Sequence, residues 1–368
     1  MKKNPHKKSH TGEFLSAVSI HKRYTACVPF FFTHYYPAPE VTKAERNDFF
    51  MAIISNTNYT NTSGSPIIIG VDNGYGNMKT AHTVFPTGIL HHAGEPVFKN
   101  DLLFYEGKYY TVGEGHKEFL PDKAMDEDYF LLTLAAIGKE LDYRGIQNGT
   151  VLLAVGLPLT WVSEQKRAFA AYLSKTRSLS FTFNGKRHLI TIAGVEVYPQ
   201  GFAAIAPHLK DFQDVNMMCD IGNGTMNVMY IINGKPVPSK CYTEKYGTHQ
   251  CTLAIREKLM QRHHVTVDDA IIEQVLRTKE ADIGEEYLTT IRAAAMEYAE
   301  GIMRRLREHE YNPAMMRLYV LSGGGCLIKN FAQYDRERVT INEDICATAK
   351  GYEVLAEAKL KKNEGGIV

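Results

Sequence analysis

The sequence predicts an α/β fold, and three observations support this class. Continuous apolar, β-branched runs at Pro66–Asp72 and Val151–Leu159 are typical of buried strands. Residues 285–309 repeat apolar side chains at spacings of three and four, which predicts an amphipathic helix. The buried face of that helix would consist of Leu288, Ile291, Ala295, Tyr298, Ile302 and Leu306. Strand and helix patterns alternate along the chain, as they do in α/β proteins.

The other elements are predicted by shorter patterns, in chain order. After the first run, "NMKTAHTVF" alternates well enough to predict a returning strand, and after the second run "SEQKRAFAAYL" predicts a helix. "NMMCDI", "MNVMYII" and Arg317–Gly325 predict three further strands. In "TVDDAIIEQVL", Thr266 and Asp269 have the spacing of a capping box, which predicts the start of a helix.

Composition indicates an ordinary globular protein. The 368 residues are enough for about two domains; 44% of them are hydrophobic and 23% charged, and the formal net charge is +1. That balance gives no sign of a nucleic-acid or membrane-surface partner. The six cysteines are scattered without a Cys-x-x-Cys pair, so we expect neither a disulfide framework nor a zinc site, and a cytoplasmic location. No apolar run approaches the roughly 18 residues that a membrane span needs.

Residues 1–65 differ from the rest of the chain. Residues 1–50 carry eight Lys and Arg against four Asp and Glu, and "SNTNYTNTSGSP" then forms a polar linker. We expect a disordered basic extension, or sequence upstream of the true start at Met51. The alternative is a basic arm that binds DNA or a partner protein.

One short pattern occurs twice, as "DNGYGNM" at Asp72–Met78 and "DIGNGTM" at Asp220–Met226. Glycine permits backbone turns whose N–H groups all point at one anion, so two facing turns would hold a polyphosphate. The two aspartates would repel phosphate unless a cation lay between them, and hydrated Mg²⁺ is the usual one. Lys79 could neutralise a phosphate oxygen. The alternative interpretation is that the repeated pattern forms two ordinary β-hairpins with Asn-Gly turns.

A third glycine segment, "LSGGGCLI" at Leu321–Ile328, follows a predicted buried strand. Consecutive glycines would let the backbone lie flat against a planar or phosphorylated ligand.

These three segments, in this order, resemble the phosphate-1, phosphate-2 and adenosine motifs of the actin-like ATPase superfamily. "YPQGFAAIA" (Tyr198–Ala206) resembles the segment that connects its two domains, and "AIREKL" (Ala254–Leu259) resembles a helix that contacts adenosine. The turns "GYGN" and "GLPLT" look most like bacterial plasmid-segregation actins of the ParM/StbA type. The resemblance runs from Pro66 to the C-terminus.

The resemblance implies a two-lobed fold of duplicated ribonuclease H-like domains with a nucleotide cleft between the lobes. Residues 66–218 plus 345–368 would form domain I, and residues 219–344 domain II. The implied ligands are ATP, with GTP as the alternative, and Mg²⁺.

The resemblance also assigns roles to particular residues. Asp72 and Asp220 would hold the water shell of Mg²⁺, and Gln200 would orient the attacking water rather than act as a strong base. The expected nucleotide-binding residues are Gly74, Tyr75, Gly76, Asn77, Lys79, Gly222, Asn223, Gly224, Thr225, Arg256, Glu257, Gly323, Gly324 and Gly325.

The implied function is a slow ATPase that polymerises with copies of itself and pushes plasmids apart through a DNA-binding adaptor, without contacting nucleic acid directly. The alternatives are a small-molecule kinase and a non-polymerising scaffold or chaperone-like ATPase of the same superfamily. A kinase would need a catalytic Asp beside an acceptor hydroxyl and a substrate-recognising insertion, and we find neither in the sequence.

Overall fold

The computed structural model describes residues 64–115 and 127–364. All of them belong to one unit of the chain, Thr42–Val368. The expected basic extension lies outside the described residues, apart from its last two positions.

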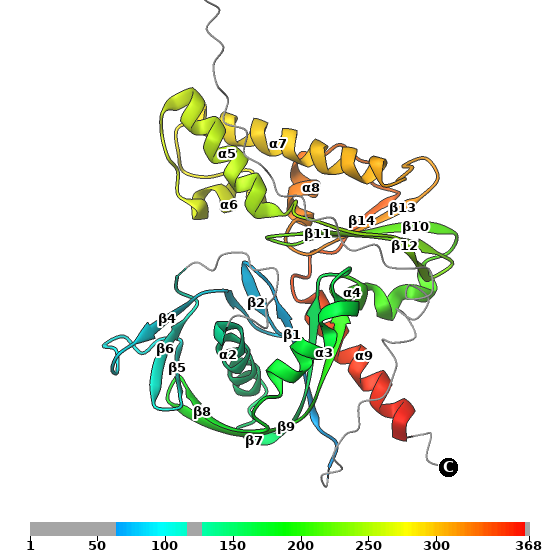
Figure 1. The fold of residues 1–368 in the computed structure, drawn as a ribbon. Coiled ribbons are helices and arrows are strands. Elements are labelled where there is room, and N and C mark those ends of the chain that lie inside the picture. The colour runs from blue at the N-terminus through cyan, green and yellow to red at the C-terminus, as the bar shows by residue number, and fades with distance from the viewer. Residues whose placement is uncertain (1–63, 116–126, 365–368) are drawn as a thin grey trace, which may run out of the picture. The chain divides into compact units, whose positions relative to one another are not determined.

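A mixed sheet forms the first half of the fold (Figure 1). Within the described residues it has nine strands, in the order β3-β2-β1-β7-β9-β8-β5-β6-β4. Strands β1, β7 and β9 are parallel to one another, and the remaining neighbours pair antiparallel. The bounds are β1 (Ile67–Asn73), β2 (Asn77–Lys79), β3 (Val84–Pro86), β4 (Ile89–His92), β5 (Leu102–Tyr105), β6 (Lys108–Val112), β7 (Asn148–Leu157), β8 (Ser178–Phe183) and β9 (Lys186–Pro199).

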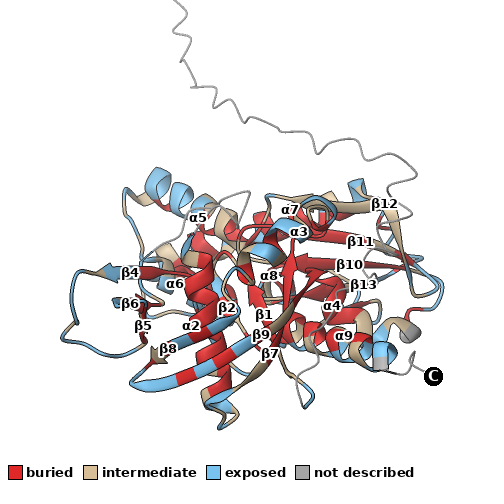
Figure 2. Cartoon of the chain, turned by 60° about the horizontal axis from the view of Figure 1, so that its bottom comes forward, coloured by how far each residue is buried: buried red, intermediate tan, exposed pale blue. Residues whose placement is uncertain are grey.

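Both faces of this sheet are covered by helices, which explains the apolar run of β7. Val151, Leu153 and Val155 enter one core together with side chains of α2 (Glu127–Tyr143) and α3 (Val162–Leu173). Leu152 and Ala154 point the other way, into a core with residues of α9 (Ala347–Glu364) and α4 (Phe202–Ile205). Alternate residues of a strand point to opposite faces, so a strand covered on both sides is apolar throughout. Figure 2 shows the buried length of α2 against these strands.

A second sheet follows the short helix η2 (Ala206–Asp211) and has the order β12-β11-β10-β13-β14. Its strands are β10 (Val215–Ile221), β11 (Met226–Ile232), β12 (Lys235–Glu244), β13 (Arg317–Leu321) and β14 (Val339–Ile341). One face packs against α5 (Thr248–His263), α6 (Asp269–Thr278), α7 (Glu285–Glu308) and α8 (Gly325–Phe331). On the other face, Met218 and Met229 pack with Leu159 and Phe202, which lie in the segments that follow β7 and β9.

Helix α9 packs unusually closely on the first sheet, and three glycines make this possible. A β-carbon at Gly156 would lie 1.7 Å from the Tyr352 hydroxyl oxygen, and one at Gly70 would lie 2.1 Å from the Ala349 carbonyl oxygen. Gly351 in the helix itself approaches the carbonyl oxygen of Ala203 in the same way. Any side chain at these positions would push the helix away from β1, β7 or α4.

Most elements expected from the sequence are present. The helix predicted at 285–309 is α7, and the six residues of its expected apolar face are all buried. The expected capping box at Thr266 is wrong: Asp268 caps α6, accepting a hydrogen bond from the Ala270 amide, so the helix begins closer to its first apolar residue. The predicted domain boundary after residue 218 falls inside β10, and we propose that the boundary lies before Val215.

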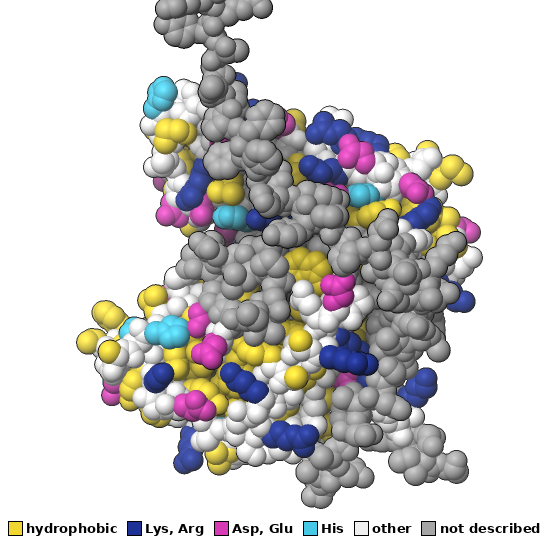
Figure 3. All heavy atoms as spheres, in the orientation of Figure 1, with side chains coloured by type: hydrophobic (Ala, Val, Ile, Leu, Met, Phe, Trp, Pro, Cys, Tyr) yellow, Lys and Arg dark blue, Asp and Glu magenta, His cyan; other side chains and the backbone are white. Residues whose placement is uncertain are grey.

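On the face shown in Figure 3, basic and acidic side chains are interspersed over the described part of the molecule. No helix among the described residues is both long enough and apolar enough to cross a membrane.

Candidate functional site

A cleft opens where the two repeated turns meet, and it is lined by both sheets and by helices of the second half. It contains about 1300 Å³ of empty space, counting the solvent at its mouth. The sequence-predicted residues that line it are Asp72, Gly74, Tyr75, Gly76, Asn77, Lys79, Gln200, Asp220, Gly222, Asn223, Gly224, Thr225 and Gly323.

The first turn joins β1 to β2 and is held by backbone and threonine hydrogen bonds. The Gly74 amide donates to the Asp72 carbonyl at 2.9 Å, and the Thr87 hydroxyl donates to the Gly74 carbonyl at 2.8 Å. A β-carbon at Gly74 would lie 2.4 Å from the Asn77 carbonyl oxygen, so the tight turn requires glycine there.

The second turn joins β10 to β11 and is braced by the start of α5. The Gly222 amide donates to the Thr225 carbonyl at 2.9 Å. The first amides of α5, at Thr248 and His249, donate to the carbonyls of Gly222 and Asn223. The start of α5 thereby holds the second turn in place.

The Gly74 and Gly222 amides are used within the turns, but other turn amides remain available to a ligand. Within the described residues, the amides of Gly76, Asn223 and Gly224 donate to no other atom. Such amides make a favourable environment for an anion.

Opposite charges meet at the base of the cleft. Lys79 Nζ lies 3.3 Å from Asp72 Oδ2, and the Gln200 amide nitrogen donates to Asp72 Oδ1 at 3.1 Å. The Ser322 hydroxyl donates to Asp220 Oδ1. Both carboxylates are almost fully buried, which makes their charge costly unless a cation is close.

The titration of these groups follows from that arrangement. Burial lowers the pKa of Lys79, but the carboxylates of Asp72 and Asp220 outweigh burial, so its pKa is raised above the ordinary value. Burial raises the pKa of Asp220, with Asp72 adding to the effect and the Ser322 hydrogen bond opposing it. A second cation near Asp220 would therefore be favourable.

The residues present fit a magnesium–phosphate complex better than a bare metal ion. Among the described residues no group of three or more His, Cys, Asp and Glu could hold a metal. Mg²⁺ usually keeps several waters and takes only one or two carboxylates plus phosphate oxygens, which is what Asp72 and Asp220 beside the two turns can offer.

The third glycine segment divides into a ligand-facing part and a packing part. A β-carbon at Gly323 would meet nothing within 4 Å, and Gly323 lines the cleft. Gly324 lies against the Ile221 side chain and Gly325 against Ile341, so these two expected nucleotide-binding glycines serve packing, outside the cleft lining. The preceding residue, Ser322, has a left-handed backbone (φ 65°), a strained conformation of the kind that clusters at functional sites.

The two residues expected near the base or ribose of the nucleotide, Arg256 and Glu257, are not part of the cleft lining. Arg256 pairs with Asp269 at 2.8 Å and Glu257 accepts a hydrogen bond from Gln261, and neither lines the cleft. The helix residues that line the cleft are Thr248 and Thr252 of α5, Glu273, Leu276 and Arg277 of α6, and Cys326 and Leu327 of α8. Arg256 and Glu257 lie in α5, about one turn beyond the cleft-lining Thr252, and no residue of α6 was expected at the cleft.

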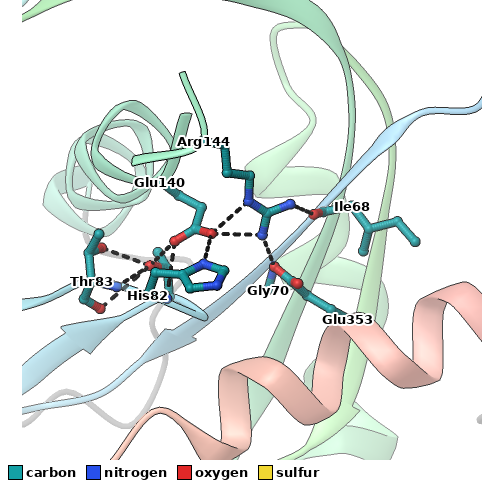
Figure 4. A network of polar contacts seen from close by, with 8 residues as sticks. Ile68, Gly70, His82, Thr83, Glu140, Arg144 and Glu353 are labelled. Atoms are coloured by element: carbon teal, nitrogen blue, oxygen red, sulfur yellow. Dashed lines mark hydrogen bonds and ion pairs between the residues drawn. The ribbon is translucent and has the colours of Figure 1, made fainter. Parts of the chain in front are cut away.

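Behind the first turn lies a buried polar network (Figure 4). Glu140 of α2, fully buried, accepts hydrogen bonds from the Thr80 hydroxyl, the His82 amide and ring, and Arg144. Burial would raise the pKa of Glu140, but these hydrogen bonds outweigh it and lower the pKa below the ordinary value. Since Thr80 follows Lys79, the network anchors the strand that carries the cleft lysine.

Arg144 extends this network to β1 and to helix α9. Its guanidinium donates to the Ile68 carbonyl at 2.9 Å and to Glu353 Oε1 at 2.6 Å, and Glu353 also accepts from the Gly70 amide.

Two protein-family models match the chain. Residues 70–202 match the model described as the N-terminal domain of actin-like proteins, and residues 218–331 match the C-terminal domain of the archaeal, MreB-like actin homologue. No curated protein matches the chain.

Many solved structures share the fold. The apo ParM protein of pSK41 superposes with a TM-score of 0.62 at 17% identity, over 82% of this chain and 100% of its own. Ta0583, an archaeal actin homologue also known in complex with ADP, gives 0.65 at 20% identity, over 79% and 99%. A ParM from Clostridium botulinum, solved as a 15-stranded filament, gives 0.61 at 16% identity, over 80% and 100%. The predicted two-lobed actin-like fold is confirmed, and the chain belongs to the actin-like ATPase superfamily.

Proposed function

We propose that this protein binds ATP, or GTP in its place, together with Mg²⁺ in the cleft, and that it polymerises in the nucleotide-bound form. The observation that carries this proposal is the pair of facing glycine turns, with amides that donate to no other described atom, beside the group formed by Asp72, Lys79 and Asp220. A triphosphate would satisfy the amides, and the accompanying cation would compensate the carboxylates.

Each residue at the base of the cleft has a part in the proposed hydrolysis. Asp72 and Asp220 would hold the water shell of Mg²⁺, which when bound supplies charge stabilisation to the phosphates. Lys79 would donate to a phosphate oxygen. The Gln200 amide nitrogen is used by Asp72, so its Oε1 is the atom that could accept a hydrogen bond from the attacking water. An amide positions water but removes its proton poorly, which favours slow turnover.

Self-assembly is the part of the proposal that the filament-forming relatives support. Filaments need head-to-tail contacts between different surfaces of identical subunits, repeated without closing into a ring. We propose that nucleotide binding favours these contacts and that hydrolysis weakens them. Growth against a DNA-bound adaptor in the cytoplasm would then separate plasmids, with no direct contact between this protein and DNA.

One experiment tests the core of the proposal. Purified protein at tens of micromolar is mixed with Mg-ATP or Mg-GTP, light scattering is followed, and samples are imaged by negative stain. Filaments are expected with nucleotide for the wild type and for Asp282→Ala, an exposed carboxylate outside the cleft lining. Asp220→Ala should give none.

Two outcomes would contradict the proposal. A monodisperse solution that turns over ATP only when a small-molecule acceptor is added would support the kinase alternative. A monodisperse solution that hydrolyses ATP without an acceptor would support a non-polymerising scaffold.

A further inference from the structure

Asn227 lies directly opposite Asp220 in the second sheet. The two residues are partners in the antiparallel pair of β10 and β11, so their side chains leave the sheet on the same face. Asn227 is 1% exposed and lines the cleft. It was not among the residues predicted from the sequence.

The hydrogen bonds of Asn227 fix the orientation of its amide. Its Oδ1 accepts from the Leu159 backbone amide at 3.3 Å and from the Thr243 hydroxyl at 2.9 Å. A backbone N–H can only donate, so the oxygen must face Leu159 and the NH₂ group is turned to the other side. Asp220 is the cross-strand partner of Asn227 and its carboxylate can only accept, so the NH₂ group is the part of the amide that can serve it.

The same chain of hydrogen bonds begins in the segment that follows β7. The Thr160 amide donates to the Thr243 hydroxyl oxygen at 3.4 Å, and that hydroxyl donates to Asn227. Leu159 and Thr160 connect the first sheet to α3, whereas Thr243, Asn227 and Asp220 belong to the second sheet. The donors at Thr160 and Thr243 both point toward Asn227, and hydrogen bonds aligned in this way polarise and strengthen one another.

We infer that Asn227 is a positioning residue that couples Asp220 to the Leu159–Thr160 segment across the two sheets. When Asp220 is held in place by a bound magnesium nucleotide, Asn227 is kept in the orientation that accepts from Leu159 and Thr243, and the contact between the sheets tightens. The inference rests on the proposed function only for the identity of that ligand.

Coupling of this kind is reciprocal, so weakening the sheet contact must weaken nucleotide binding. Thr243 provides the test because it belongs to the chain of hydrogen bonds and does not line the cleft. Thr243→Val keeps the shape and removes the hydroxyl, and Thr243→Ser is the matched control that keeps it. We expect Thr243→Val to bind Mg-ATP about threefold more weakly, the effect of one neutral hydrogen bond, and Thr243→Ser to bind as the wild type does.

Hydrogen exchange gives a second measurement. A merely structural role of Asn227 would not make amide protection depend on nucleotide. In the wild type, protection of the Leu159 and Thr160 amides should rise when Mg-ATP binds. In Thr243→Val and in Asn227→Ala this rise should be lost, while thermal melting shows that the variants are folded. Asn227→Asp, which places a second carboxylate against Asp220, should lose Mg-ATP affinity more severely than Thr243→Val.

Equal affinity of Thr243→Val and wild type, with an undiminished rise in protection, would overturn the inference. It would also be overturned if Thr243→Val lowered the protection of the Leu159 and Thr160 amides equally in the free and the nucleotide-bound protein while its affinity for Mg-ATP stayed unchanged. If the wild type itself binds no nucleotide, it is the proposed function that fails.

Discussion

Gly76 of the first turn and Asn223 of the second turn lie in direct contact: a β-carbon built on Gly76 would be 2.6 Å from Asn223 Cγ. The contact joins segments that are far apart in the chain, and it fixes how closely the two amide-bearing turns approach. We therefore expect Gly76→Ala to hold the turns apart and to lower nucleotide affinity about tenfold, or about 1.4 kcal/mol, measured by titration calorimetry.

The clash itself can be tested by restoring the space. Gly76→Ala combined with Asn223→Gly should recover affinity relative to Gly76→Ala alone, since the three atoms nearest to the added β-carbon all belong to the Asn223 side chain. Gly94→Ala, which meets nothing within 4 Å, is the matched control and should behave as the wild type. Unchanged affinity in Gly76→Ala would show that turn separation does not control binding.

Lys79 already provides a positive charge beside the buried carboxylates of Asp72 and Asp220. Lys79→Met keeps the length of the side chain and removes its charge, so a triphosphate would lose a charge-assisted hydrogen bond. A loss of about 1.5–3 kcal/mol, at least tenfold in affinity for Mg-ATP, is expected. Lys99→Met, which breaks an exposed ion pair with Glu95, should leave affinity unchanged. Fluorescence titration with labelled ATP distinguishes the two, and equal affinities would remove Lys79 from the site.

The turns and their carboxylates could be predicted because each is encoded within seven consecutive residues. The far end of the cleft could not, because it depends on how helices pack. Ile255 and Leu259 turn α5 toward the core of the second sheet, which leaves Thr248 and Thr252 at the cleft and Arg256 paired with Asp269. Short strands such as β4 and β5 were missed because four residues carry only a weak local pattern.

The cleft-lining residues of α6 are expected to contact the nucleobase end of the ligand. Glu273 and Arg277 line the cleft from successive turns of α6 and are exposed, whereas Arg256 and Glu257 are outside the lining. Glu273→Ala and Arg277→Ala should each weaken nucleotide binding several-fold and alter the ratio of ATP to GTP affinity. Arg256→Ala and Glu257→Ala should change neither quantity. The reverse pattern in competition binding would reinstate the assignment expected from the sequence.

Glu140 predicts a pH dependence of stability whose sign follows from its lowered pKa. A carboxylate whose pKa is lower in the folded protein than in the unfolded chain stabilises the fold at pH values above its pKa in the unfolded chain. For Glu140 that pKa is about 4.5. That contribution is lost as the pH falls through the folded pKa. Glu140→Gln should therefore unfold about 1–3 kcal/mol more easily at pH 7, because one amide cannot accept all the hydrogen bonds from Thr80, His82 and Arg144.

The difference between wild type and Glu140→Gln, measured by urea unfolding from pH 7 to pH 3.5, should shrink once the pH is below about 4.5. Glu357→Gln, which breaks an exposed pair with Lys361, is the control and should stay within about 0.5 kcal/mol of the wild type at every pH. A difference that stays constant down to pH 3.5 would mean that the charge of Glu140 does not stabilise the network behind the first turn.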